Sequence, residues 1–307
     1  MRLLFAFLLA CVCAFCASSF QRGLLAVNEG NYRAAIQQFN KEIKERPKNA
    51  QAYIARGDAY FQLKSYLNAI NDYTKAIEYN KRLGARIYVS RAKAYYEMKE
   101  YNKAVLDLNL AVNLAPIAAN YYERANAYYA LGNFKAAVGD YTQGISLERN
   151  PAKAYGDRAA AYLGMGNTKS AINDYTTLIQ IEPQNATAYG GRGKVYFSTG
   201  DISAAIADYT QAIKLDSRST QTFLDRAAAY EKLGDRDSMI RDYGSVISLS
   251  GNDPKAYLRR ANAYYDLEKY KEASADARRA CELGDCSLVE KVNKAQAESQ
   301  EKSFWDF

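Results

Sequence analysis

Two charged residue types recur at a fixed spacing along this 307-residue chain, and their pairing is the first chemistry to consider. Arginines stand 33 to 35 residues apart, and an aspartate follows in every period but the first, where Gln38 takes its place. The arginines are Arg22, Arg56, Arg91, Arg124, Arg158, Arg192, Arg226 and Arg260; the aspartates are Asp72, Asp107, Asp140, Asp174, Asp208, Asp242 and Asp276. One cation and one carboxylate per period predict a ladder of ion pairs that fixes the register of repeated units. Capture of an anion by the arginines is the alternative.

The residues that most enzymes need are missing from the sequence. It contains no histidine, which excludes histidine-dependent triads and most zinc sites. Gly193 and Lys194 lack the other residues of a phosphate-binding loop. We therefore expect no enzymatic activity, no cofactor and no metal site. The formal net charge of +7 is spread along the chain, with lysines among acids such as Glu97 and Glu231, so nucleic-acid binding is not expected.

Apolar residues at three- and four-residue intervals predict the helices that position these charges. Within residues 152–185, two such blocks cover 155–163 and 171–181. Gly164, Gly166 and Asn167 separate the blocks, and Pro183 follows the second. This pattern predicts two amphipathic helices joined by a tight turn. Both helices carry apolar residues on more than one side, so the hairpin needs neighbours of the same shape.

The hairpin is repeated along the chain with a fixed set of small and aromatic residues. In residues 186–219 the set is Gly193, Tyr196, Gly200, Ala205, Tyr209 and Ala212. The 34-residue pattern resembles the tetratricopeptide repeat (TPR) family. The resemblance implies an all-α fold: a right-handed α-solenoid of about eight helical hairpins plus a C-terminal capping helix. Met239 and Leu178 depart from the pattern, because each replaces a second-helix alanine.

The resemblance divides the chain into three parts. Residues 1–18 are expected to be a signal peptide, 19–287 a TPR superhelix, and 288–307 a capping helix with an aromatic tail. The eight repeats are predicted at about 16–49, 50–84, 85–117, 118–151, 152–185, 186–219, 220–253 and 254–287. We expect Ser18 or Ser19 to cap the first helix. In the last helix, Leu288, Val289 and Val292 share one side and should pack on the final repeat.

In the TPR family, residues of the first helix of each hairpin line the inner face of the superhelix. The family's spacing places Lys93, Tyr96, Tyr122, Asn126, Tyr129, Lys194, Phe197, Asn262 and Tyr265 on this face. Aromatic rings beside lysine and asparagine suit an extended peptide or a helix of a partner protein. Because Tyr96, Tyr129 and Tyr265 each follow a packing tyrosine, packing is the alternative role for them.

The N-terminus has the pattern of an export signal. Met1 and Arg2 precede an apolar stretch over residues 3–15, which is followed by small residues. The stretch is too short to span a membrane as a helix. Residues 8–11 also resemble a bacterial lipobox, which would lipidate Cys11. Both interpretations place the mature chain outside the cytoplasm, in the periplasm, at the cell envelope or secreted.

Removal of the signal leaves two cysteines, Cys281 and Cys286. In an oxidising compartment these could form a disulfide, or they could remain small packing residues. Together these observations favour a non-catalytic scaffold that binds a protein or peptide partner in the concave TPR groove, in an envelope or secretory assembly. The alternative is a lipid-anchored structural component of an outer-membrane complex, which would contact the membrane only through its anchor.

Overall fold

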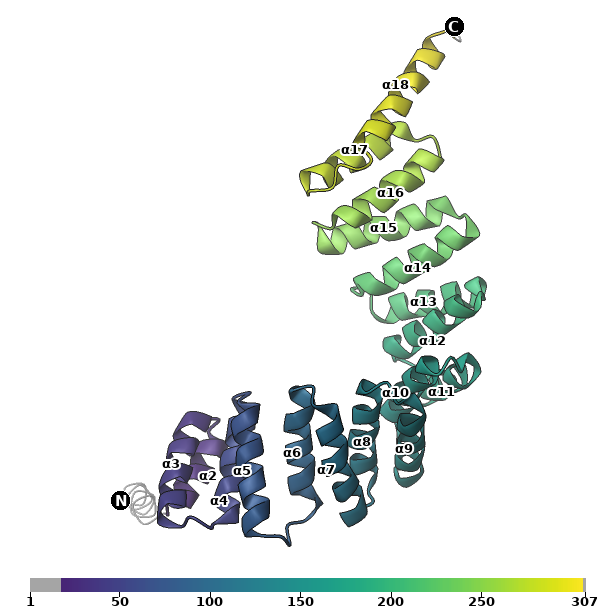
Figure 1. The fold of residues 1–307 in the computed structure, drawn as a ribbon. Helices are drawn as coiled ribbons and strands as arrows, with labels where there is room; N and C mark the ends of the chain where they lie inside the picture. The colour runs from purple at the N-terminus through teal and green to yellow at the C-terminus, as the bar shows by residue number, and fades with distance from the viewer. Residues whose placement is uncertain (1–17, 306–307) are drawn as a thin grey trace, which may run out of the picture. The chain divides into compact units, whose positions relative to one another are not determined.

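The structure is a computed structural model that describes residues 18–305, and these residues form seventeen α-helices with no β-strand (Figure 1). The helices follow one another as hairpins with short connections. The first unit of the fold contains α2 Ser19–Asn28, α3 Tyr32–Glu45, α4 Ala50–Gln62, α5 Tyr66–Tyr79, α6 Ala85–Glu97, α7 Tyr101–Leu114, α8 Ala118–Ala130 and α9 Phe134–Leu147. They are followed by α10 Ala152–Gly164, α11 Thr168–Ile181, α12 Ala186–Thr199, α13 Ile202–Leu215, α14 Thr220–Leu233, α15 Arg236–Ser250, α16 Pro254–Asp266, α17 Tyr270–Glu282 and α18 Val289–Trp305.

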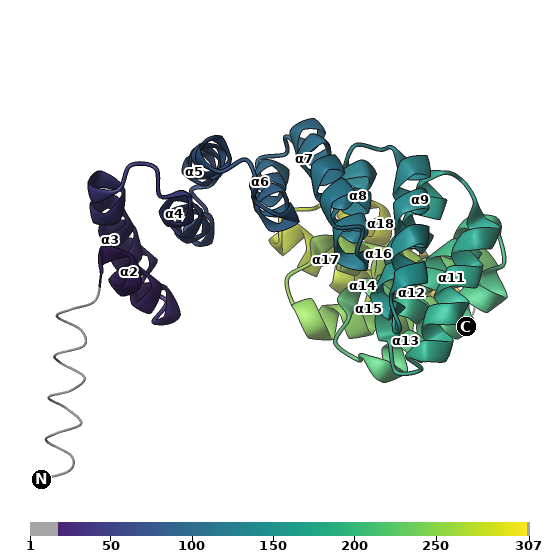
Figure 2. The same cartoon turned by 90° about the horizontal axis from the view of Figure 1, so that it is seen from below.

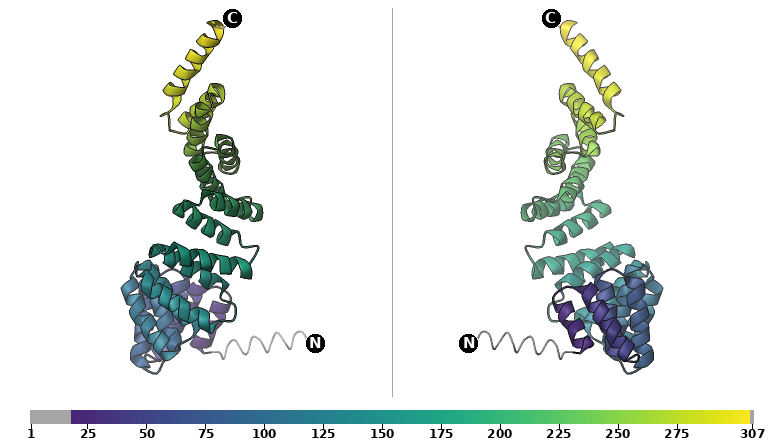
Figure 3. Two further views of the ribbon diagram at one scale, coloured as in Figure 1. Left: turned by 90° about the vertical axis from the view of Figure 1, so that its right-hand side faces the viewer. Right: turned by 90° about the vertical axis from the view of Figure 1, so that its left-hand side faces the viewer.

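The chain divides into two compact units, the first ending at Ala154 and the second beginning at Tyr155. In the first unit the helices α2 to α9 stack in chain order, and each pair of consecutive helices is in contact (Figure 2). In the second unit α12 to α18 stack in chain order in the same way (Figure 3). Neighbour-on-neighbour packing of this kind is typical of a repeat solenoid.

The turn inside each hairpin depends on one residue in the left-handed backbone region. Glycine occupies this place in five hairpins, with φ between 73° and 86°, whereas Lys64, Lys99 and Glu268 occupy it in the other three, with φ of 58° to 61°. Where glycine stands, the next residue is Asn or Asp, and its side chain caps the second helix, as Asn167 does by accepting from the Ser170 amide. The three turns without glycine have no such side-chain cap. The sequence thus stabilises five of these turns more than the other three.

Small residues let the two helices of a hairpin approach closely. A Cβ atom added at Gly193 of α12 would lie 2.8 Å from the ring of Tyr209 in α13, a residue that is only 1% exposed. The second-helix alanines, such as Ala205, are fully buried, and Met239 fills the same place with 3% exposure. The small and aromatic pattern is therefore a packing pattern.

In two hairpins a large residue on one helix is matched by a glycine on the facing helix. In α10 and α11, Leu178 takes the place of an alanine, and Gly156 faces it; an added Cβ at Gly156 would lie 3.3 Å from the leucine. In α8 and α9 the sizes are reversed: Gly144 stands at the alanine position, and the Tyr122 ring fills the space that a Cβ on Gly144 would need. Large and small residues alternate across these facing positions, which keeps the packing dense.

The last helix covers the final hairpin, as the apolar stripe predicted. Leu288 and Val292 pack with Ala261, Ala273 and Ala277, and Val292 is fully buried. At the other end, Ser18 caps α2: its hydroxyl accepts from the Gln21 amide, and the Gln21 side chain accepts from the Ser18 amide. The predicted signal peptide and lipidation at Cys11 lie outside the described residues, apart from Ser18.

Candidate partner-binding groove

The arginine and aspartate series form the ladder that the sequence predicts. Within each hairpin, Nε and Nη2 of the arginine donate to the two carboxylate oxygens of the aspartate sixteen residues later, as in the Arg56–Asp72 bonds of 2.7 and 2.6 Å. The same pair of bonds joins Arg91 to Asp107 and recurs in the later hairpins. In the first hairpin, Arg22 donates to Gln38 instead, at 3.2 Å.

The third guanidinium nitrogen connects one hairpin to the preceding one. Nη1 of Arg91 donates to the Thr74 hydroxyl, and Nη1 of Arg192 donates to the Thr176 hydroxyl, both at 3.0 Å. Arg56, Arg124 and Arg226 make the equivalent bond to Asn40, Asn109 and Thr210. Because the donors of these arginines are used within the fold, the structure favours the ladder over anion capture.

Two aromatic rings flank the guanidinium group of six of the ladder arginines, which explains the rings at fixed distance on either side of the arginine; these are Arg56, Arg124, Arg158, Arg192, Arg226 and Arg260. The Arg192 guanidinium carbon lies 5.9 Å from the ring centres of both Tyr189 and Tyr196. Hydrogen bonding to Asp208 raises the pKa of Arg192. Burial raises the pKa of Asp72, against the lowering effect of its bonds with Arg56. The ladder is a structural device, and the binding site has to be sought elsewhere.

A groove runs over the first helices of the first unit. Its deeper part is a cavity of about 250 Å³ lined by Phe61, Ala92, Lys93, Tyr96, Glu97, Leu108, Glu123 and Asn126. A second cavity, of about 320 Å³, is lined by Asp58, Phe61, Gln62, Tyr73, Arg86, Ser90 and Lys93. Because Phe61 and Lys93 line both cavities, the two adjoin on the surface of α4, α6 and α8. We call them together the unit-1 groove.

Three of the predicted partner-binding residues come together in the unit-1 groove. Lys93 Nζ lies 2.8 Å from a carboxylate oxygen of Glu123. Asn126 accepts a hydrogen bond of 2.6 Å from the Tyr141 hydroxyl, which leaves its Nδ2 group to donate to a ligand. Tyr96 completes the set. The groove therefore has an apolar floor with a few polar groups that converge on it.

Acidic and basic groups both line the shallower part of the groove. The Tyr73 hydroxyl donates to Asp58 at 2.8 Å, and Arg86 lies 3.5 Å from the same carboxylate. Burial raises the pKa of Asp58, although both neighbours lower it. Mixed charge of this kind suits the backbone and polar side chains of a peptide better than a polyanion.

The sequence analysis missed a row of aromatic pairs at the turns of three successive hairpins. Phe61 meets Tyr66, Tyr96 meets Tyr101, and Tyr129 meets Phe134, edge to face, with ring centres 5.1 to 5.4 Å apart. The two rings of each pair are five residues apart and straddle the turn. That spacing, repeated at the period of the hairpins, is the signal that would have revealed them.

Two predicted groove residues are engaged elsewhere in the structure. Tyr122 packs against Gly144, and its hydroxyl donates to Glu148 at 2.7 Å. Tyr265 lies under the Lys291 ammonium of α18, which is 4.2 Å from the ring centre, and it also contacts Tyr270 edge to face. In both places an aromatic ring has found a partner within the fold.

The predicted groove residues of the second unit do not form one cluster. Lys194 is 3.3 Å from Asp225, in a cavity of about 340 Å³ that also includes Gly190. Phe197 packs against the cluster of Ala205, Tyr209 and Ala229. The Asn262 side chain donates to the Leu258 carbonyl of its own helix at 2.9 Å. The unit-1 groove is therefore the stronger candidate site.

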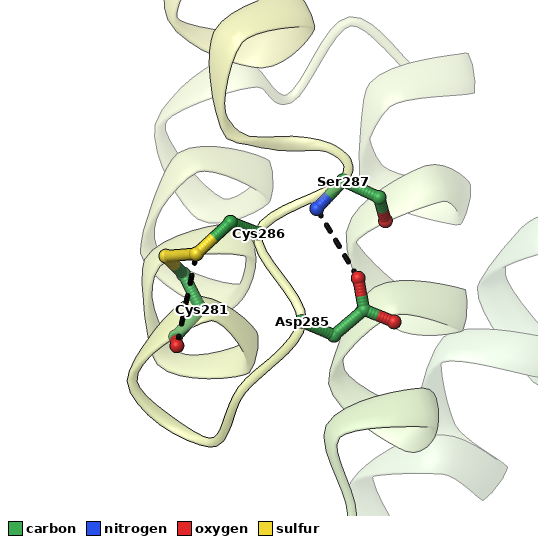
Figure 4. The surroundings of a disulfide bond; sticks show 4 residues. All are labelled: Cys281, Asp285, Cys286 and Ser287. Atoms are coloured by element: carbon green, nitrogen blue, oxygen red, sulfur yellow. Dashed lines mark hydrogen bonds between the residues drawn. A yellow bond between two sulfur atoms is a disulfide. The ribbon is translucent and has the colours of Figure 1, made fainter.

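Cys281 and Cys286 lie at the end of α17, and the structure joins their sulfur atoms (Figure 4). Beside them, the Ser287 amide donates to Asp285 at 3.1 Å, and hydrogen bonding from the Ser287 side chain and amide lowers the pKa of Asp285. The disulfide stays a prediction for an oxidising compartment. Within residues 18–305, no group of side chains suited to a metal ion is present. Among the helices described, none is long and apolar enough to cross a membrane.

Stacked helical hairpins, with the same ion pair repeated inside them, define an α-solenoid repeat protein. Models described as tetratricopeptide repeat match residues 20–81, 85–117, 118–151 and 254–283, and one described as TPR repeat matches 161–200 and 193–234. The chain is a tetratricopeptide repeat protein. No curated protein matches it significantly in sequence.

Solved structures show the same fold. The C-terminal part of a TPR repeat-containing protein from Cytophaga hutchinsonii aligns with a TM-score of 0.67 and 17% identity, over 77% of this chain and 97% of that one. A tetratricopeptide repeat protein from Parabacteroides merdae aligns with a TM-score of 0.56 and 19% identity, over 90% and 96%. YrrB, described as a TPR protein with an unusual peptide-binding site, aligns with a TM-score of 0.52 and 19% identity, over 60% and 95%. Such repeats are generally non-catalytic scaffolds for protein–protein interaction.

Proposed function

We propose that this protein is a non-catalytic scaffold that binds an extended segment of a partner protein in the unit-1 groove. The observation that carries the proposal is the pair of adjoining cavities that share Phe61 and Lys93. Its length over α4, α6 and α8 suits an extended chain, and its apolar floor suits a hydrophobic side chain as the anchor. A peptide-binding site in YrrB, a protein of the same fold, supports this class of partner.

Some groove residues would anchor the bound segment, and others would orient it. Phe61, Tyr96 and Leu108 would surround the apolar anchor, because they line the deeper cavity. The Nδ2 group of Asn126 would donate to a backbone carbonyl of the bound segment. Lys93, held by Glu123, would distinguish partners by the charge of the residue beside the anchor.

Crosslinking followed by pull-down of the partner tests this proposal with paired charge reversals. Lys93→Glu places a second acid beside Glu123 in the groove, and we expect it to weaken capture at least tenfold. Lys75→Glu is the matched control, because Lys75 is half exposed on the second helix α5 and lies outside the groove. Tyr96→Ala should weaken capture as Lys93→Glu does. Capture that survives both groove substitutions would refute the assigned site.

The proposal includes export to the cell envelope or beyond, motivated by the N-terminal pattern. Cleavage after Ala17 would leave Ser18 as the first residue, and this residue caps α2. A mature chain that begins there would keep its first helix capped. The alternative, a structural component anchored through a lipid on Cys11, predicts a longer mature chain with added lipid mass. Intact mass measurement of the purified native protein distinguishes the two, and an N-terminus at Met1 would contradict both.

A further inference from the structure

The second helix α7 carries an apolar stripe on its exposed side. Leu106, Leu110 and Leu114 follow at intervals of four residues, and Ile117 comes just after the helix. Their exposed fractions are 66%, 46%, 56% and 54%. Residues four apart lie on the same side of a helix, so the three leucines form one surface, and Ile117 follows in the connection before α8. We call these four residues the α7 stripe.

Leu106 and Leu110 are specific to this hairpin, whereas Leu114 stands where other hairpins also have an apolar residue, such as Leu147, Ile181 and Leu249. Counting from the aspartate of the ladder, the other hairpins place Gln37, Asn71, Gly139, Asn173, Ala207, Arg241 and Ala275 where α7 has Leu106. They place Lys41, Lys75, Gln143, Thr177, Gln211, Ser245 and Arg279 where α7 has Leu110. Packing inside the solenoid is therefore satisfied by small or polar residues at these places. Leucine there serves no need that the other hairpins share.

The low charge around the α7 stripe bears on which kind of partner covers it. From residue 104 to residue 119 the only ionisable side chain is Asp107, which is 4% exposed and paired with Arg91. The nearest exposed charge on α7, Lys103, is paired with Glu100 at 2.7 Å. A membrane-surface helix is usually rich in lysine and arginine, whereas Lys103 is the one such residue on α7.

We propose that the α7 stripe is a contact between two copies of this chain. In a twofold interface each residue meets the same set on the other copy, so an exposed charge near the axis would face its like. The net charge of +7 makes most of the surface unsuitable for such pairing, whereas the α7 stripe is charge-free. Antiparallel α7 helices would place Leu110 against Leu110 of the second copy and Leu106 against its Leu114.

The size of the stripe sets the strength of the dimer. Four side chains exposed by about half present on the order of a few hundred Å² of apolar surface, the range in which exposed patches mark interaction sites. This is below the roughly 800 Å² that each partner contributes to a standard stable interface. The dimer is therefore weak, with a dissociation constant on the order of tens to hundreds of micromolar.

Sedimentation equilibrium of the full mature chain, from micromolar to submillimolar concentrations, tests the dimer. The variant Leu106→Asn/Leu110→Gln introduces residue types that other hairpins hold at these places, so it should fold. We expect it to raise the dissociation constant at least tenfold. Leu147→Gln is the matched control, because it removes a leucine that is 55% exposed on α9 outside the stripe, and it should leave dimerisation unchanged.

The orientation is tested by cysteine crosslinking. Leu110→Cys should form a disulfide between two chains on mild oxidation, and Gln143→Cys, at the equivalent place on α9, should not. A chain that stays monomeric throughout, or a dimer that persists in Leu106→Asn/Leu110→Gln, overturns the proposal. Stripe-dependent binding to vesicles of zwitterionic lipid by a monomeric chain would also overturn it and assign the surface to a membrane.

Discussion

Removal of Asp208 isolates the energetic role of the ladder. The Arg192 and Asp208 side chains are only 18% and 9% exposed, and two hydrogen bonds of 2.8 and 2.9 Å join them. Asp208→Ala leaves the cation between two tyrosine rings without its carboxylate. Breaking a buried pair in this way costs about 3–5 kcal/mol, and the retained bond to Thr176 favours the lower end. About 3 kcal/mol lowers the melting temperature of a unit of this size by roughly 6–12 °C.

The double variant Arg192→Leu/Asp208→Ala distinguishes a lost attraction from an unpaired charge. The TPR pattern has leucine where this chain has the arginine, so the double variant places an accepted residue there. Its melting temperature should return to within a few degrees of the wild type, because no buried charge remains.

Differential scanning calorimetry, with urea titration as a second measure, follows these variants. Asp237→Ala serves as the control for loss of an exposed carboxylate, since Asp237 is 66% exposed and pairs with Lys269 at 3.4 Å; its effect should be below about 1 kcal/mol. Equal melting temperatures for Asp208→Ala and Asp237→Ala would refute the cost assigned to the broken pair. A double variant as unstable as Asp208→Ala alone would refute the role of the unpaired charge.

Three further predictions concern packing, protonation and the cysteines. Gly144→Leu should destabilise the protein by about 1–3 kcal/mol in urea titrations, because the leucine would clash with Tyr122. Tyr122→Gly/Gly144→Leu copies the Gly156–Leu178 arrangement and should recover most of the lost stability. No recovery would show that the two positions do not compensate. Burial raises the pKa of Asp58 above its ordinary value of 3.8, so ionisation of this carboxyl group opposes folding as the pH rises from 3.8 through the raised pKa. Asp58→Asn should therefore gain stability over the wild type across that pH rise and show no gain below it. A stability difference that stays constant between pH 3 and pH 7 would contradict this. Cys286→Ser should lower the free energy of unfolding of the oxidised protein by about 2 kcal/mol at most, which is the loop-closure value for so short a loop, and it should not affect the reduced protein. On reduction the native chain should gain the mass of two hydrogens, and an unchanged mass would exclude the disulfide.

The periodic residues made most of the fold predictable. The hairpins and the ladder followed from spacing alone, because a solenoid repeats the same local contacts, whereas the first cap was left open between Ser18 and Ser19 and is Ser18 in the structure. The ladder could be predicted as a pairing, although the third bond, from Arg91 back to Thr74, was not foreseen. It depends on which threonine the stacking brings within reach.

The candidate site was less predictable, since side-chain direction is set by packing partners. Lys93 and Tyr96 line the groove as their position in the repeat suggests. Tyr122 does not serve the groove in the same way, because the absence of a side chain at Gly144 draws its ring onto α9. Tyr265 likewise meets Lys291, which belongs to the capping helix and has no counterpart in the other repeats. Residues that break the repeat pattern, Gly144 and Lys291, therefore determine where these two tyrosine rings lie. The spacing of the family does not predict such residues.

The bond from Arg56, Arg91, Arg124, Arg192 and Arg226 to the preceding hairpin gives the chain a polarity with an evolutionary consequence. The unit 186–219 holds Arg192, which donates backward to Thr176, and Thr210, which accepts from the following Arg226. A duplicated copy of this segment would therefore carry both halves of the joint, a donor for the unit before it and an acceptor for the unit after it. The gene can lengthen by whole units without a compensating substitution at the seam. The same unit also has a glycine turn at Gly200 and an Asp201 cap, so a copy would keep its turn as well as its joint.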